Sequence, residues 1–279
     1  MRTDDINLVS FTSEHIDGAV ALSRQANWPH RAEDWHLVLR LSHGVAAVDE
    51  AGRVVGTIFM TPYGGDCATI SMVIVDEGMR GRGLGRKLMD EAITLAGDRS
   101  LRLIATAEGL PLYCKLGFVV EGEIFQHQGH LVHLAQGGEV ETATAGDFSA
   151  IKALDRAAFG ADRSALIDFL ADVAQAVVIR RNGRIEAYGA LRAFGRGDVI
   201  GPVIAPSAED AKSLITALAF RRSSDFLRVD TNDGSGLGDW LAEIGLNLVG
   251  GGIAMRRPAG GVAVSQDARI FALANQALG

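Results

Sequence analysis

The stretch MRGRGLGRKL, from Met79 to Leu88, combines residue types that could bind a phosphate group. Its alternating glycines and its cationic side chains are Gly81, Gly83, Gly85, Arg80, Arg82, Arg86 and Lys87. An apolar run, ATISMVIV, precedes it, and the helical pattern GLGRKLMDEAITLA begins within it. The first amides of a helix have no internal partner and lie at the positive end of the helix dipole. The amides from Arg82 to Arg86 are therefore predicted to form an anion site.

Two known phosphate loops do not match this stretch. A P-loop requires Gly-Lys followed by Ser or Thr, whereas Lys87 follows Arg86 and precedes Leu88. A dinucleotide fingerprint requires Gly-x-Gly-x-x-Gly and an acid on a following strand, and Leu101 to Ala107 contains no acid. A solvated basic helix start remains the structural alternative.

The elements around the loop occur twice along the chain. Each half reads as helices, a hairpin, an apolar strand, a helix, a second strand and a short helix closed by glycine. The hairpins are GVAAVDEAGRVVGTIFMTPYG and QAVVIRRNGRIEAYGALRAFG, and the closing segments are PLYCKLGF and GDWLAEIGL. Gly52 and Gly183 are 131 residues apart, and Gly117 and Gly245 are 128 apart. This spacing indicates a duplication.

The two repeats predict two α/β domains, residues 1–136 and 137–279, with a boundary near AQGGEVE. The C-terminal stretch SQDARIFALANQALG predicts a final helix with Ser265 as its N-cap.

The stretch VDEGMRGRGLGRKLMDEAI resembles the acyl-CoA-binding motif of the GNAT superfamily of acetyltransferases. The family pattern is Arg or Gln, two residues, Gly, one residue, then Gly or Ala, and it is matched by Arg80, Gly83 and Gly85. LYCKLGF, Leu112 to Phe118, resembles a second family segment. The resemblance implies tandem GNAT-like domains, each a mixed, mostly antiparallel sheet flanked by helices.

The second half departs from the motif. At an offset of 129 residues, Arg80, Gly83 and Gly85 correspond to Glu209, Lys212 and Leu214, and the glycines are lost. At an offset of 128, Tyr113 corresponds to Leu241. The second half is thus similar to a degenerate GNAT-like domain, and in the tandem group it resembles, this domain is thought to complete the substrate cleft. We expect one CoA per chain, in the first half.

The resemblance implies acetyl-CoA as co-substrate and a role for residues beside the loop. The residues expected at the acyl-CoA are Val73, Ile74, Val75, Arg80, Gly81, Arg82, Gly83, Leu84, Gly85 and Arg86. By its register within LYCKLGF, Tyr113 matches the family's general acid, and the pKa of a phenol is close enough to that of a thiol for it to protonate a departing thiolate. The alternative is a core tyrosine that packs under the loop. Some members of the family have a glutamate that acts as the general base at the position where this chain has Thr69. Glu108 is the candidate base, and a helix-start acid is the equally good alternative.

The acceptor site is predicted in ANWPHRAEDW, Ala26 to Trp35. Pro29 favours a loop or helix start, which leaves Trp28 available to a ligand. Trp28 and Tyr63 are the expected substrate residues. His30, His36 and His43 show no metal-ligand spacing, and no metal is expected.

Composition limits the remaining classes of function. The chain has 279 residues, 48% of them hydrophobic, and a formal net charge of −7. That charge argues against nucleic acid or an anionic membrane as partner. No signal or transmembrane pattern is seen, so a cytoplasmic protein is expected, as a monomer or a homodimer. The predicted function is direct transfer of an acetyl group from acetyl-CoA to the primary amine of a small molecule or amino acid. The alternative is an acyl-CoA-binding regulatory or sensor module with little turnover.

Overall fold

The computed structural model describes residues 6–132, 134, 138–222, 225–258 and 268–279. The predicted domain boundary, between residues 136 and 137, lies outside the described residues. The strands are β1 (Asn7–Ser10), β2 (His43–Val48), β3 (Val54–Tyr63), β4 (Cys67–Val75), β5 (Ser100–Ala105), β6 (Val119–His130), β7 (Glu141–Thr142), β8 (Gln175–Arg181), β9 (Arg184–Phe194), β10 (Gly197–Ala205), β11 (Phe226–Asn232), β12 (Asn247–Arg257) and β13 (Arg269–Ala272). The helices are α1 (Ile16–Gln25), α2 (Ala32–Leu41), α3 (Leu84–Ala96), α4 (Leu110–Lys115), α5 (Phe148–Phe159), α6 (Ser164–Val173), α7 (Ala208–Ala219) and α8 (Gly238–Glu243), with 3-10 turns at Ser13–His15, Glu77–Met79 and Ala145–Asp147.

Both predicted hairpins are confirmed. Strands β2 and β3 pair antiparallel around a turn in which Gly52 has a φ of 76°. Strands β8 and β9 pair around Asn182 and Gly183, whose φ values are 50° and 73°. Two successive residues with positive φ are what a type I′ hairpin turn requires, and Asn-Gly supplies them.

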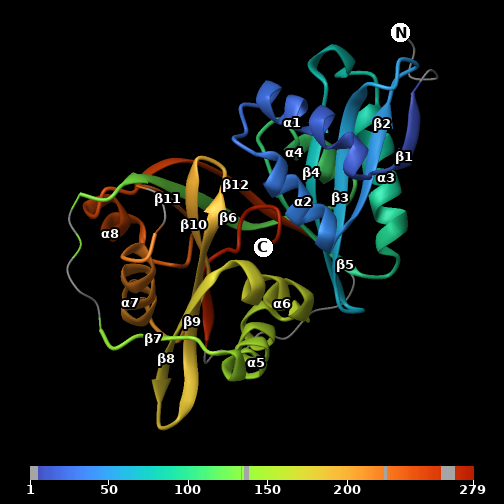
Figure 1. The fold of residues 1–279 in the computed structure, drawn as a ribbon. Coiled ribbons are helices and arrows are strands. Elements are labelled where there is room, and N and C mark those ends of the chain that lie inside the picture. Colours follow the sequence, from blue (N-terminus) through green and yellow to red (C-terminus); the bar gives the residue numbers. More distant parts are fainter. Residues whose placement is uncertain (1–5, 133, 135–137, 223–224, 259–267) are drawn as a thin grey trace.

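The strands of both halves join in one sheet, in the order β1-β2-β3-β4-β5-β12-β6-β11-β10-β9-β8-β7, with β13 paired to β10. Most pairs are antiparallel, and β4–β5 and β10–β11 are parallel. Strand β12 of the second half lies between β5 and β6, and β6 of the first half lies between β12 and β11. Gly251 permits the close pairing, because a Cβ there would lie 1.8 Å from the Ile124 carbonyl oxygen. The halves thus exchange a strand and do not form two separate sheets (Figure 1).

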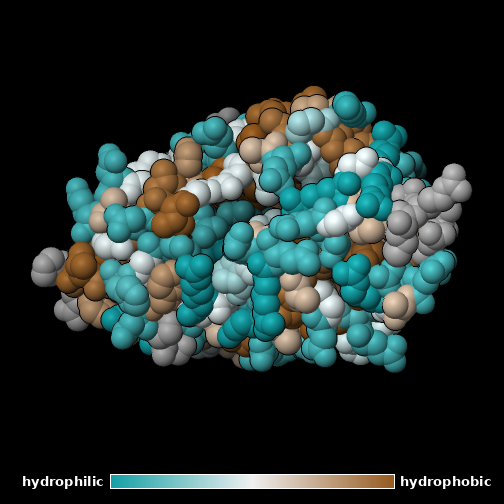
Figure 2. Space-filling view, turned by 90° about the horizontal axis from the view of Figure 1, so that it is seen from above, coloured by the Kyte–Doolittle hydropathy of each residue, from teal (hydrophilic) through white to brown (hydrophobic). Residues whose placement is uncertain are grey.

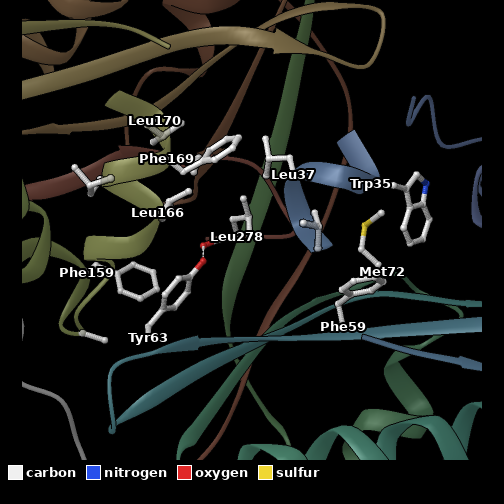
Figure 3. Close-up of a cluster of buried hydrophobic side chains, with 14 of the residues drawn as sticks. Trp35, Leu37, Phe59, Tyr63, Met72, Phe159, Leu166, Phe169, Leu170 and Leu278 are labelled. Carbon is white, nitrogen blue, oxygen red and sulfur yellow. Dashed lines mark hydrogen bonds between the residues drawn. The ribbon is translucent and has the colours of Figure 1, made fainter. Parts of the chain in front are cut away.

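Helices cover both faces of this sheet. In the first half α1 and α2 pack on one face and α3 and α4 on the other, each with its own cluster of buried apolar side chains. In the second half α7 and α8 bury a third cluster. Helices α5 and α6 share the α1–α2 cluster, so one core joins the halves, as Figure 3 shows around Tyr63, Leu278 and Phe169.

The C-terminal segment is a strand and not the predicted helix. Residues Arg269–Ala272 form β13, which pairs antiparallel with β10, and Ser265 lies outside the described residues. The open edge of β10 supplies hydrogen bonds that outweigh the helical spacing of the apolar residues.

Among the described residues, no helix combines the length and the apolar character needed to cross a bilayer. On the face seen in Figure 2, hydrophilic residues predominate and hydrophobic ones gather in small patches.

Candidate functional site

Strands β4 and β5 part in the middle of the first half. They pair from Cys67–Ser100 to Thr69–Arg102, and the ladder ends there. Beyond that point β4 bulges against β3, and Met72 takes a φ of 51°, a conformation rare for a residue with a side chain. The Thr57 hydroxyl donates to the Met72 carbonyl oxygen at 2.8 Å and holds the bulge. A gap therefore opens between Ser71–Val73 and the end of β5.

The glycine loop follows β4 and leads into α3. Asp76 anchors its start, because its Oδ1 accepts from the Gly78 amide at 3.0 Å while Oδ2 accepts from the Gln25 side chain at 3.2 Å. Gly83 is the N-cap of α3 and has no side chain to cap it. The first bond of the helix runs from the Lys87 amide to the Gly83 carbonyl. The amides before Lys87 thus have no intrahelical acceptor, as the sequence predicts.

The space in front of the loop is open. Gly81 and Gly83 have φ values of 74° and 83°, and a Cβ at either would meet no protein atom within 4 Å. A Cβ at Gly85 would make an ordinary contact of 3.5 Å with Leu112. Amides without an intrahelical acceptor, a helix dipole and unfilled space fit the pyrophosphate of an acyl-CoA.

The basic side chains of the loop lie at its exposed rim. Arg80 Nη1 lies 3.6 Å from Glu108 Oε2, and Arg86 pairs with Asp90 one turn further along α3. Glu108 is 81% exposed, so this ion pair is weak. The geometry links Glu108 to the loop's first arginine.

Tyr113 lies at the other side of the gap, on α4. Its ring packs edge-on against Phe118 and lies beside Gly109, where a Cβ would come within 2.8 Å of the ring. The side chain is 7% exposed, and burial alone raises the pKa of its phenol to about 12. Tyr113 is therefore fully protonated at neutral pH, as a general acid must be.

A cavity of about 300 Å³ fills the gap and continues to the α1–α2 face of the sheet. Its first-half lining comes from the gap, the α1–α2 loop and β6. These residues are Asn27, Trp28, Pro29, His30, Ile70, Ser71, Met72, Val73, Leu103, Ile104, Ala105, Thr106, Tyr113, Gln126 and Gln128. The second half contributes Phe194, Arg196, Arg228, Val249, Gly251, Asn275, Gln276 and Ala277. A neighbouring cavity of about 440 Å³, lined in part by Glu121, Glu123 and Asp233, shares Leu103, Ile104 and Gln276 with it.

The sequence did not predict that His30, or any residue of the second half named above, would line this cavity. The His30 ring packs edge-on against Trp28 and Phe194, and its Nδ1 lies 3.4 Å from the Ser23 hydroxyl. Burial lowers the pKa of His30 to about 4, so the imidazole is neutral at neutral pH. The available signal was the position of His30 two residues after Trp28.

The predicted site residues divide into two groups. Trp28, Val73 and Tyr113 line one cavity, whereas Tyr63 and Glu108 do not line it. Tyr63 is 2% exposed, and its hydroxyl donates to the Leu278 carbonyl oxygen at 2.5 Å, the bond drawn in Figure 3. Tyr63 thus holds the C-terminal segment that carries Asn275 and Gln276 and does not itself reach the cavity. Ile74 is buried beside the bulge. Groups of three or more His, Cys, Asp or Glu able to hold a metal are absent from the described residues.

The chain is similar to known acetyltransferases. A family described as acetyltransferase (GNAT) domain matches residues 40–120, and a second family of the same description matches residues 151–271. The uncharacterized N-acetyltransferase YitH of Bacillus subtilis is 32% identical over 248 residues, which cover 86% of this chain and 87% of that protein.

Solved structures share the fold. A putative acetyltransferase from Pyrococcus horikoshii superposes with a TM-score of 0.80 at 20% identity, covering 99% of this chain and 96% of that one. A tandem GNAT protein from the clavulanic acid biosynthesis pathway superposes with a TM-score of 0.62 at 16% identity, covering 92% and 99%. The chain therefore belongs to the GNAT acetyltransferase family, with two GNAT domains in tandem, and is an acetyl-CoA-dependent N-acyltransferase.

Proposed function

We propose that this chain transfers the acetyl group of acetyl-CoA directly to the primary amine of a small molecule or amino acid, within a ternary complex. The observation that supports this most is one cavity with Tyr113 at the β4–β5 gap and Trp28 and His30 on the opposite face of the sheet. A thioester entering through the gap would meet an amine held on the α1–α2 face.

The first domain, residues 1–136, is assigned the acyl-CoA. The amides of Gly81 to Arg86, with Leu84 at the helix start, hold the pyrophosphate, and Arg80, Arg82 and Arg86 add positive charge. Backbone groups of Val73, Ile74 and Val75, beyond the end of the β4–β5 ladder, pair with the pantetheine arm, and one amide polarises the thioester oxygen. The second domain, residues 137–279, completes the acceptor wall through Phe194 and Asn275.

Tyr113 is assigned the general acid. The amine nitrogen attacks the thioester carbon, the carbon–sulfur bond breaks, and Tyr113 donates its proton to the departing sulfur. The attacking nitrogen is positively charged after it bonds to the thioester carbon; as the amide forms it loses a proton, and this proton restores the phenol. The raised pKa of Tyr113 keeps this proton in place before attack.

In this proposal the acceptor enters the cavity as the neutral amine and not as the ammonium ion. Among the described lining residues the cavity holds no carboxylate, and His30 is a weak base because its pKa is lowered. Glu108 is assigned the role of positioning Arg80, because its carboxylate is exposed and forms an ion pair with that arginine. Loss of the amine proton to water then precedes attack.

Release of CoA thiol from acetyl-CoA in the presence of an amine panel tests this proposal. We expect release that depends on both substrates, with N-acetylated amine as product. Tight binding of acetyl-CoA without turnover on any amine would contradict it and would favour a regulatory module.

A further inference from the structure

The end of the cavity on the α1–α2 face, where the acceptor amine is assigned, is called the acceptor end. The second half of the chain contributes a hydrogen-bond donor to it. Asn275 is 1% exposed, and its Oδ1 accepts from the Ala277 amide at 3.0 Å and the Leu278 amide at 2.9 Å. Its Nδ2 has no partner among the described residues. A buried donor without an acceptor is costly, and Asn275 is one of the residues that line the cavity, so its Nδ2 calls for an acceptor from a ligand there.

The same wall carries positive charge. The described lining residues include Arg196 and Arg228 and no aspartate or glutamate. Arg228 is neutralised by Asp230, whose Oδ2 lies 2.9 Å from Nη2. Arg196 is exposed in the β9–β10 turn and has no ion pair with a described residue.

A further arginine lies behind the wall. Arg192 is 4% exposed, its guanidinium carbon lies 5.0 Å from the centroid of the Phe194 ring, and its Nε has no partner among the described residues. Burial lowers the pKa of Arg192 to about 10, which leaves it charged at neutral pH. Arg192 thus adds a positive charge behind this wall, where the carboxylates of Asp34 and Asp230 also act on it.

These groups belong to the acceptor end and not to the CoA loop. The β9–β10 turn is fixed to the first turn of α2, because the Gly195 amide donates to Asp34 Oδ2 at 3.0 Å. Helix α3, which carries the loop, packs on the opposite face of the sheet.

We propose that the acceptor amine carries an anionic group, a carboxylate, which binds Arg196 at the cavity mouth and accepts from Asn275 Nδ2. The inference rests on the proposed function and narrows it to amino acids and related amines. A guanidinium and an amide N–H match a carboxylate, and a phosphate offers the same acceptors.

Matched substrates test the charge preference. CoA release is measured with β-alanine, with its amide, with 2-aminoethyl phosphate and with a polyamine. We expect kcat/KM for β-alanine to exceed that for its amide at least about tenfold, the gain expected of one charge-assisted hydrogen bond. A kcat/KM for 2-aminoethyl phosphate higher than that for β-alanine would show that the wall binds a phosphate in preference to a carboxylate. Equal use of the amide, or preference for the polyamine, would overturn the proposal.

Two variants assign the preference to the wall. Arg196→Gln should raise KM for β-alanine about tenfold while KM for the amide changes little. Asn275→Asp keeps both backbone acceptor bonds and replaces the donor by a negative charge, so the preference should reverse. Arg184→Gln removes an exposed arginine at the start of β9, beside the β8–β9 turn, and is the matched control.

Binding separates this inference from the proposed function. Calorimetry with N-acetyl-β-alanine and its amide should show the same tenfold preference in Kd, lost in Arg196→Gln. If no amine releases CoA, the proposed function fails while the binding ratio still decides the charge preference. Equal Kd values would overturn it even if turnover is seen.

Discussion

The two halves of the molecule contain the same parting of parallel strands and treat it in opposite ways. In the first half β4 and β5 separate after Thr69 and Arg102, and a cavity occupies the gap. In the second half β10 and β11 separate after Ile200 and Val229, and β13 enters the gap. The Leu273 amide, just after β13, donates to the Asp230 carbonyl at 2.8 Å. The chain itself thus pairs the strand edges in the gap of one half and leaves a cavity in the gap of the other.

The helices that follow the two gaps differ in the same sense. The N-cap of α3 is Gly83, and its first turn contains no acid. The N-cap of α7 is Ser207, whose side chain accepts from the Asp210 amide at 3.1 Å, and Glu209 and Asp210 lie in its first turn. Side chains therefore neutralise the anion site of the second half. The structure pairs Ser207 with Gly83, whereas the sequence offset of 129 places Lys212 there.

The largest effect is expected where the halves differ in chemistry. Tyr113 and Leu241 occupy the same position of α4 and α8, and Leu241 is fully buried in the core. Tyr113→Phe removes the proton donor and keeps the ring contacts, so kcat should fall about a hundredfold, the typical contribution of general acid catalysis, with little change in Kd for acetyl-CoA. Steady-state kinetics and calorimetry measure the two quantities.

The pH profile provides the control for Tyr113. Because the pKa of the phenol is raised to about 12, the group stays protonated and active as pH rises to 10. We expect no loss of wild-type rate from this group below pH 10. Full turnover in Tyr113→Phe would remove the residue from the mechanism.

The second effect concerns the open loop. Gly83→Ala places a methyl group in the open space, and the Kd for acetyl-CoA should rise at least about tenfold because backbone approach is blocked. Gly52→Ala is the matched control, since Gly52 has a φ of 76° and equally meets no protein atom. Both variants should lose a similar ~1 kcal/mol of stability from the left-handed backbone. Calorimetry should also give one acetyl-CoA per wild-type chain; a stoichiometry of two would contradict the blocked second gap.

Local features of the site could be predicted from the sequence. The loop, α3 and the register of Tyr113 depend on residues close together in the chain, so glycine conformations, capping and helical periodicity determine them. The repeated hairpins were predictable for the same reason.

The cavity wall could not be predicted, because it depends on strand exchange. Arg228 and Asn275 line the same cavity as Ser71, in a sheet in which β6 and β12 have changed places between the halves. Tyr63 and β13 show the same limit. Tyr63, expected at the substrate, is buried in the shared core by its contact with Leu278. The tail, which has helical spacing, forms β13 in the second gap through its pairing with β10, because contacts distant in sequence outweigh the local pattern.

The smallest effect is expected from the N-cap of α7, which has a capping side chain where α3 has none. Ser207→Ala removes the bond to the Asp210 amide and should lower the free energy of unfolding by about 1 kcal/mol, whereas Ser207→Gly should cost only a few tenths. Neither variant should alter the Kd for acetyl-CoA, because the capped amides lie in the closed half. Denaturant unfolding with and without acetyl-CoA measures both quantities. An altered Kd would mean that the second helix start also contacts the ligand, and the contrast between the two gaps would then fail.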